Sequence, residues 1–136
     1  TDINSGIREW GLKHTYIQTW LPDLGGTNHS TARDMAQILY NIDNPNFLST
    51  SSREKIFDYM GHVHNNRLIA AGLPSGATFL HKTGDIGKML GDAGIVFAPN
   101  GKKYIVVIFA NRPHNSPLGK DFIVKASEII YNNMVY

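Results

Sequence analysis

One short segment, His81-Lys82-Thr83-Gly84, contains three residues whose chemistry suits the binding of a carboxylate. The ammonium of Lys82 can attract a carboxylate and bias nearby proton transfers. Thr83 adds a hydroxyl donor, and Gly84 has no side chain, so a ligand can lie against the backbone. Lys-Thr-Gly alone is a frequent chance match, and the plain alternative is a solvated strand end. The segment therefore predicts a strand end that binds an anion. This prediction needs support from the rest of the sequence, because the motif alone is weak.

A serine with a lysine one helical turn further on is a second arrangement with chemical potential, because the lysine lowers the cost of removing the serine proton. The chain has one such pattern, Ser52-Arg53-Glu54-Lys55. It opens a predicted helix, where Ser51 and Ser52 are better explained as caps. We therefore reject Ser52 as the nucleophile.

Metal and cofactor chemistry finds little support in the residue pattern. His62 and His64 are two apart, with no carboxylate at a helpful spacing. Gly84 and Gly87 lack the strand-turn-helix setting of a dinucleotide site. The chain has no cysteine, which excludes disulfides, cysteine-based zinc sites and thiol catalysis. We predict neither a metal nor a cofactor.

The composition is that of one globular domain. The chain has 136 residues, of which 42% are apolar and 18% are charged, so a core can form. Thirteen basic against eleven acidic residues give a net charge of +2, too small a margin to indicate a nucleic-acid partner. Apolar runs such as 104–110 are far shorter than the roughly 18 residues that span a membrane. No signal peptide or initiator methionine opens the chain, so we expect that it was processed or cut from a longer one.

The part of the chain at 1–76 is predicted to be mainly helical. A first helix should end at Gly11, which fits the left-handed stop. An irregular, omega-like loop follows at 19–28, where Pro and Gly-Gly occur. A second helix is predicted to start near Thr31 and a third at Ser51, each with a capping residue.

The part at 77–136 is predicted to be an antiparallel meander with a last helix. Three strands are expected, at 78–83, 93–98 and 103–110. Asn100-Gly101 is a strong hairpin signal between the last two strands. A helix follows Ser116-Pro117. This order predicts the α+β class, with a helix laid across an antiparallel sheet, in a single partial domain at 1–136.

Five segments of the chain, taken in order, resemble the C-terminal half of the class A β-lactamase family and of the β-lactamase-like serine hydrolases that share its fold. They are 7–12, 20–24, 30–36, 67–74 and 81–84. Lys-Thr-Gly belongs to the motif set of these penicillin-recognising serine enzymes. The resemblance covers nearly the whole chain and implies the C-terminal half of the β-lactamase/transpeptidase-like fold.

The resemblance also implies roles at the strand end. Lys82, Thr83 and Gly84 would bind the carboxylate of a β-lactam or of a peptide. The backbone N–H of Asp85 would form half of an oxyanion hole. Arg67 would add a second cation, unless it is an ordinary surface or structural arginine.

Two departures from the family affect the expected chemistry. Ser52 follows the omega-like loop, whereas the nucleophile of the family precedes it, and no Ser-x-Asn motif occurs anywhere. The loop reads Trp20-Leu21-Pro22 where the family has Trp-Glu-Pro. A leucine therefore stands in place of the glutamate that activates the deacylating water, and Asp23 is the alternative base. We expect slow deacylation, with the nucleophile outside this chain.

The resemblance predicts the C-terminal segment of a β-lactamase-family serine acyl hydrolase of the antibiotic-resistance type. The alternatives are a penicillin-binding or D-alanyl-D-alanine carboxypeptidase-like protein, and a non-catalytic binding module. Export to the periplasm or cell surface is usual in the family and is expected here. In the family's sheet, the strand at 103–110 also pairs with an N-terminal strand. We therefore expect association through 103–110, with a second copy or with the missing half, unless local rearrangement covers that edge.

Overall fold

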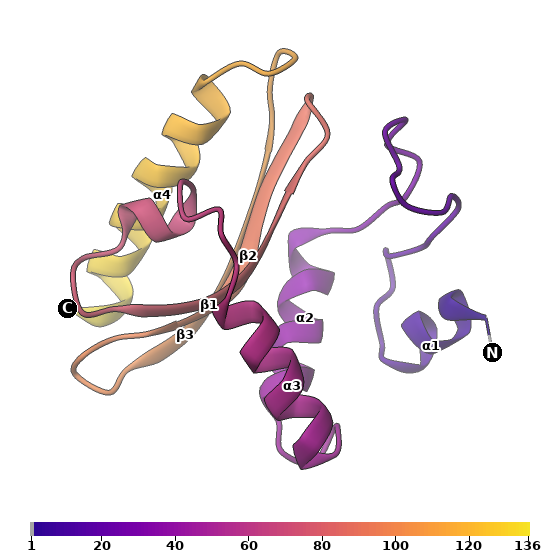
Figure 1. Ribbon diagram of the computed structural model, residues 1–136, viewed down its shortest axis with the longest axis horizontal. Coiled ribbons are helices and arrows are strands. Elements are labelled where there is room, and N and C mark those ends of the chain that lie inside the picture. Colours follow the sequence, from indigo (N-terminus) through magenta and orange to yellow (C-terminus); the bar gives the residue numbers. More distant parts are fainter. Residues whose placement is uncertain (1) are drawn as a thin grey trace.

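The computed structural model describes residues 2–136 and places a three-stranded antiparallel sheet between two helical layers (Figure 1). The strands follow the order β1-β2-β3 and are β1 (Thr78–Asp85), β2 (Met89–Phe97) and β3 (Lys103–Asn111). One face carries α4 (Leu118–Val135) and the short 3-10 helix η1 (Ile69–Gly72). The other face carries α2 (Ala32–Asp43) and α3 (Thr50–Gly61). The predicted α+β class is confirmed.

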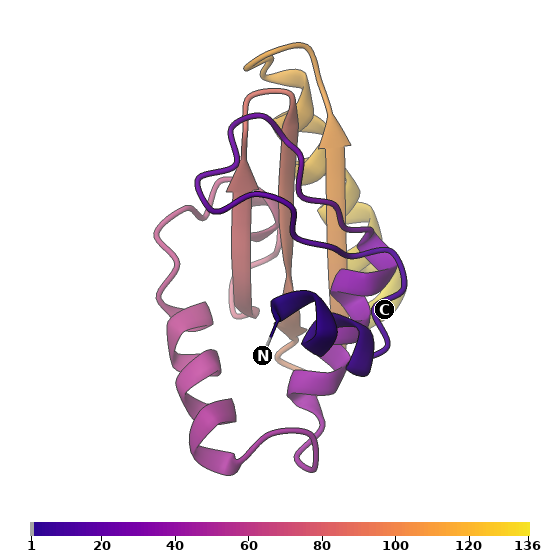
Figure 2. The same ribbon diagram turned by 90° about the vertical axis from the view of Figure 1, so that its right-hand side faces the viewer.

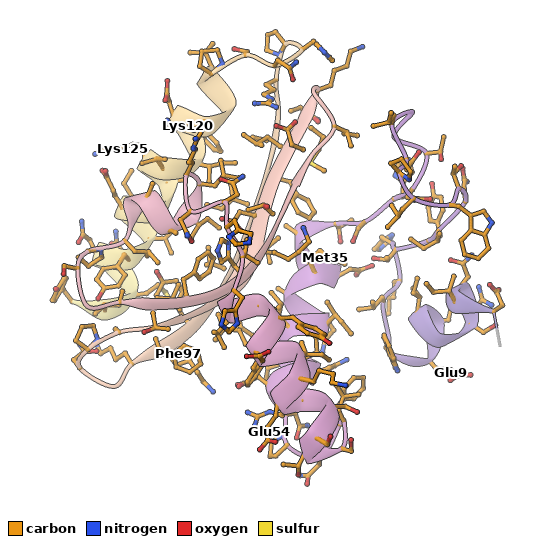
Figure 3. The ribbon with its side chains drawn as sticks, viewed as in Figure 1. Glu9, Met35, Glu54, Phe97, Lys120 and Lys125 are labelled. Atoms are coloured by element: carbon orange, nitrogen blue, oxygen red, sulfur yellow. The ribbon has the colours of Figure 1, made fainter. Side chains whose placement is uncertain are left out.

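The core consists of two apolar clusters, one on each face of the sheet. Side chains alternate along a strand, so β2 supplies both clusters from neighbouring positions. Val96 packs with Ile123 of α4 on one face, and Ile95 packs with Leu39 of α2 on the other. In Figure 3, Lys125 on α4 and Glu54 on α3 mark the two outer layers. The sheet is thus covered on both sides, and β1 and β3 are its edges.

The chain before α2 lies outside this sandwich. Helix α1 (Ile3–Glu9) is capped by Asp2, whose side chain accepts from the N–H of Asn4. Gly11 has a φ of +80° and the N–H of Leu12 donates to the carbonyl of Ile7 at 3.2 Å, so the predicted helix stop is confirmed. Figure 2 shows the segment from α1 to α2 passing in front of the sheet.

The predicted caps of α2 and α3 have different outcomes. Thr31 caps α2 as predicted, because its hydroxyl accepts from the N–H of Asp34 at 3.1 Å. The cap of α3 is Ser49, whose hydroxyl accepts from the N–H of Ser52 at 3.2 Å. The prediction that Ser51 and Ser52 are the caps is wrong, since both lie in the first turn of the helix.

The second strand begins earlier than predicted. It starts at Met89 instead of residue 93, because Gly91 and Asp92 are poor strand formers that hide its beginning. In the ladder, Gly91 lies opposite Phe109 of β3, and a Cβ at Gly91 would come within 2.8 Å of that ring. The packing of Phe109 therefore explains why residue 91 is a glycine, and this glycine is why the sequence pattern missed the start of β2.

Candidate active site

The predicted anion-binding residues form the last part of β1. Lys82 pairs in register with Ala93, and Thr83 pairs with Asp92. Because side chains alternate, Lys82 lies on the α2–α3 face and Thr83 on the α4 face. Lys82 is exposed and its ammonium donates to the carbonyl oxygen of Thr83. Within residues 2–136 no strand pairs with the outer edge of β1. A ligand that meets both side chains must therefore lie along this edge.

Gly84 leaves the backbone of β1 uncovered. A Cβ at this position would meet no atom within 4 Å, whereas Gly91 opposite it is packed under Phe109. Nothing packed against Gly84 within residues 2–136 requires a glycine there. The close approach of a ligand to the strand is a use for this open space.

Asp85 and Arg112 fix the turn that follows β1. The Asp85 carboxylate accepts from the N–H of Gly87 at 2.8 Å and from the Arg112 guanidinium at 2.6 Å. These two donors, Gly87 first, hold the pKa of Asp85 below its ordinary value, although partial burial opposes them. Arg112 also donates to the carbonyl oxygen of Gly87 at 2.9 Å. Arg112 had no role in the sequence-based prediction, because nothing near it in the sequence points to Asp85.

The structure places the Arg67 segment beside β1. Arg67 is exposed, and its backbone N–H donates to the side chain of Asn65 at 3.2 Å. The neighbouring Asn66 has its side-chain oxygen 3.3 Å from Nε2 of His81. The segment is therefore held at His81, the residue before Lys82. The Arg67 guanidinium itself forms no hydrogen bond or ion pair within residues 2–136.

A buried histidine–aspartate pair lies behind the strand end. Nδ1 of His81 is 2.8 Å from Oδ1 of Asp92, and both side chains are almost completely buried. The other oxygen of Asp92 accepts from the N–H of Ile69 at 3.1 Å. The sequence-based prediction gave this pair no role, although Asp92 is the one charged residue of the otherwise apolar strand β2, which is a visible signal.

The omega-like loop is held by its own side chains. Oδ1 of Asn28 accepts from the backbone N–H groups of Gln18 and Thr19 at 2.8 and 2.9 Å. The Asp23 carboxylate accepts from the N–H of Asn28 at 2.6 Å and from the Thr27 hydroxyl at 3.0 Å. These bonds, that of Asn28 first, hold the pKa of Asp23 below its ordinary value. The carboxylate of Asp23 is therefore a structural part of the loop.

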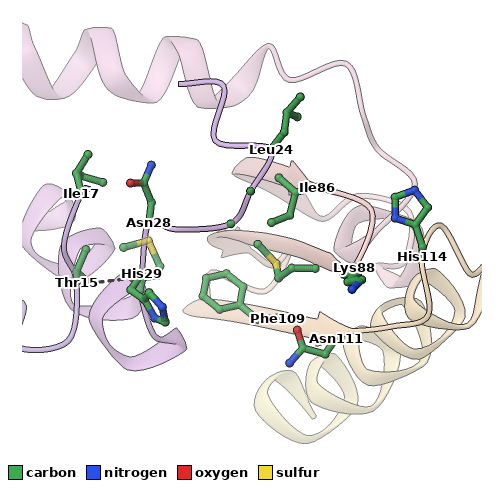
Figure 4. A pocket seen from close by; sticks show the side chains of 15 residues that line it. Thr15, Ile17, Leu24, Asn28, His29, Ile86, Lys88, Phe109, Asn111 and His114 are labelled. Carbon is green, nitrogen blue, oxygen red and sulfur yellow. Dashed lines mark hydrogen bonds between the residues drawn. The ribbon is translucent and has the colours of Figure 1, made fainter. Parts of the chain in front are cut away.

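A cavity of about 870 Å³ separates this loop from the sheet (Figure 4). Its walls come from the loop, from the start of α2, and from β2 and β3, with Leu24 and Asn28 on one side and Ile86 and Phe109 on the other. It reaches the site at Ile86, next to the turn after β1, and does not include 82–85. The cavity thus adjoins the strand end and is mostly apolar.

The sequence of the chain matches the profile of the beta-lactamase enzyme family over residues 1–134. The chain belongs to this family. None of the curated proteins compared with the chain is significantly similar to it. Within residues 2–136 no helix is long and apolar enough to cross a bilayer.

Solved structures of PBP-A and of two β-lactamases have the same fold. PBP-A is 42% identical, with a TM-score of 0.93, and the match covers 96% of this chain and 49% of PBP-A. A β-lactamase from Francisella tularensis is 21% identical, with a TM-score of 0.85, over 96% of this chain and 53% of the other. The TLA-1 extended-spectrum β-lactamase is 20% identical, with a TM-score of 0.85, over 98% and 54%. The chain spans about half the length of these relatives.

The other residues that the sequence analysis considered for this β-lactamase-family chain lie on exposed helices and loops. Ser52 and Lys55 lie on α3, and both are exposed. Nδ1 of His62 faces the carbonyl oxygen of Asp58 at 2.7 Å. No group of three metal-ligating side chains occurs within residues 2–136. Leu21 is 84% exposed on the loop, and Trp20 beside it is 93% exposed.

Proposed function

We propose that this chain supplies the substrate-carboxylate side of a β-lactamase-family serine acyl hydrolase. The ammonium of Lys82 and the hydroxyl of Thr83 bind the carboxylate at the free edge of β1, and the N–H of Asp85 stabilises the oxyanion. A serine outside the chain attacks the amide carbonyl. Its proton passes to the nitrogen of the breaking C–N bond, and a serine ester forms. The observation that carries this proposal is the 42% identity to PBP-A over 96% of the chain.

Ligand binding by the strand end tests the proposal without the nucleophile. Benzylpenicillin added to the 136-residue chain should shift the amide resonances of 82–85 more than those elsewhere. Lys82→Met should weaken this binding about tenfold, because it removes the charged donor. Lys55→Met, which changes an exposed lysine on α3, is the matched control and should leave the affinity unchanged.

Intact mass measurement after incubation with the same penicillin completes this test. No covalent adduct is expected, since we place the nucleophile outside the chain. A stoichiometric adduct on Ser52, or equal binding by Lys82→Met and the unmodified chain, would contradict the proposal.

We further propose that the acyl-enzyme of the complete protein breaks down slowly. Leu21 has no group that accepts a proton, and the Asp23 carboxylate is engaged by the N–H of Asn28 and by Thr27. A leucine-to-glutamate mutant of PBP-A has been solved as an acyl-enzyme complex with penicillin G. That structure supports the inference that a leucine matters to the acyl-enzyme of a relative.

Leu21→Glu in the protein that carries the nucleophile should speed the release of a trapped penicilloyl group by at least about 100-fold, as expected for a general base. Leu24→Glu is the matched control, because Leu24 is an exposed leucine of the same loop. Rapid penicillin turnover by the unmodified protein would instead favour Asp23 as the base, and Asp23→Asn would then abolish it.

Two other functions have separate signatures. A D-alanyl-D-alanine carboxypeptidase-like protein would release D-alanine from a peptide ending in that dipeptide and would deacylate penicillin slowly. A non-catalytic binding module would bind the same carboxylates with no serine ester formed. Ser-x-x-Lys and Ser-x-Asn motifs encoded upstream favour an enzyme, and their absence favours the module. Export, which is usual in the family, is also part of the proposal.

Association through β3 is the partner proposal. Within residues 2–136, β3 pairs only with β2, so one row of its backbone groups lacks a strand partner. Such an edge favours pairing with another chain. Sedimentation of the chain at micromolar concentration should show a dimer, or a complex with the other half of the fold when that half is supplied. A monomer with amides of 104–110 protected on both sides of the strand would contradict this proposal.

A further inference from the structure

His81 faces an oxygen atom at each of its two ring nitrogens. Nδ1 lies 2.8 Å from Oδ1 of Asp92, and Nε2 lies 3.3 Å from Oδ1 of Asn66. In this orientation of the Asn66 amide, its Nδ2 also donates to the carbonyl oxygen of Val63 at 3.4 Å. A carboxylate and an amide oxygen are acceptors only, so with Asn66 in this orientation both ring nitrogens donate. The arrangement is therefore satisfied by an imidazolium ring next to an ionised Asp92.

The same two side chains join the elements that carry the two candidate cations. Asp92 binds the N–H of Ile69 at the start of η1, two residues after Arg67. His81 binds Asn66 on one side of Arg67 and precedes Lys82 in β1. The chain of contacts from Lys82 to Arg67 thus runs through a pair that solvent barely reaches.

We propose that His81, Asp92 and Asn66 are positioning residues that hold the Arg67 segment against β1, and that their contacts are complete only when the His81 ring carries two protons. Loss of the Nε2 proton places a lone pair against the Asn66 oxygen. Asn66 must then turn over and lose its bond to Val63, or leave the ring. Only one part of this proposal rests on the proposed function, namely that the arrangement keeps Lys82 and Arg67 close enough to bind one carboxylate.

The other groups around the His81 ring give its two nitrogens no alternative hydrogen-bond partner. Phe79 stacks on the ring with centroids 4.4 Å apart and carries no charge. From α4, the Ser127 hydroxyl donates to the carbonyl oxygen of Ile69 rather than to the ring. Lys82 projects to the opposite face of β1. The charged and titratable groups of the neighbouring segment are His62, His64 and Arg67, all exposed.

Nuclear magnetic resonance of the 136-residue chain between pH 5 and pH 9 tests the proposal without any substrate. The ring nitrogens of His81 should both carry protons at the acidic end. The amide resonances of Asn66 and Arg67 should then shift with the same midpoint as the His81 ring as the pH rises. Asn66→Ala should abolish the response of Arg67 and leave the His81 ring doubly protonated at low pH. His64→Gln, which changes an exposed histidine of the same segment, should leave the response intact.

Two results would overturn the proposal: an unprotonated Nε2 over the whole pH range, or an Arg67 amide whose response survives in Asn66→Ala. Asp92→Asn gives a further measurement where it folds, because a neutral partner should favour loss of the second ring proton. Benzylpenicillin provides a separate readout. Asn66→Ala should weaken its binding about two- to fivefold, as expected for misplacing one exposed cation. Failure of the unmodified chain to bind it would count against the proposed function, whereas the His81 and Arg67 resonances decide the positioning role.

Discussion

The end of β1 and the loop at 19–28 are the two parts of the candidate site, and they are held in place differently. The strand end is fixed from behind by the buried His81–Asp92 pair, which reaches η1 through the N–H of Ile69. The loop is fixed from within, by bonds that Asn28 and Asp23 make to other loop residues.

This difference matches the two roles proposed for the site. The geometry of the strand end depends on the packing of the sheet, so it cannot change without a cost to folding. The loop depends on short-range polar contacts, and its apolar residues are exposed, as Leu21 is at 84%. If the proposed function holds, residues of the loop can therefore change the deacylation step while the strand proposed to bind the carboxylate stays the same.

A substitution behind the strand end should destabilise the protein more than one in the loop. Gly94→Ala tests this and has the largest expected effect. A Cβ at Gly94 would lie 2.2 Å from the carbonyl oxygen of Leu80 and 2.7 Å from Cβ of His81. One of these atoms is in the backbone and the other is attached directly to it, so neither can move by a side-chain rotation. The strand β1 must therefore move away from β2. We expect a loss of about 3 kcal/mol in the free energy of unfolding, measured in urea.

Gly84→Ala is the matched control, because a Cβ there meets nothing within 4 Å. It should change the free energy of unfolding by less than about 0.5 kcal/mol. The same variant should weaken benzylpenicillin binding if the ligand lies against this strand. Equal destabilisation by the two variants would show that the β1–β2 contact does not limit the stability of the site.

The sequence predicts the two parts of the site to different degrees. Periodicity and turn signals predict the sheet and its covering helices, since hydrophobic alternation reflects burial. The early start of β2 is missed, because Gly91 reflects the packing of Phe109 and not strand propensity. The pairing of His81 with Asp92, and of Asp85 with Arg112, is missed for another reason. Each pair joins positions whose contact depends on register or on chain reversal, which local pattern does not encode.

Loosening the loop alone should leave the strand end unchanged. Asn28→Ala removes the acceptor of the Gln18 and Thr19 N–H groups, and it also removes a donor to the Thr19 carbonyl oxygen. We expect the loop to open more easily by about 1–2 kcal/mol. Amide exchange of Gln18 and Thr19 measures this, with exchange in β1 as the reference. Asn28→Asp keeps the two acceptor bonds and should show a smaller change.

Acid should produce the smallest effect and should again act on the loop first. Bonds from backbone N–H groups hold the pKa of Asp23 below its ordinary value, that of Asn28 being the largest contribution, so its carboxylate stabilises the loop above the unfolded pKa of 3.8. This stabilisation is lost as the pH falls through the folded pKa. The pKa of Asp85 is lowered too, by the N–H of Gly87 and by Arg112, but Arg112 keeps its bond to the Gly87 carbonyl oxygen at any pH in this range. Below about pH 4 the amide of Asn28 should therefore lose protection before that of Gly87. Asp23→Asn should remove the pH dependence at Asn28, and an Asn28 amide that stays protected down to pH 2 would contradict the account of the loop.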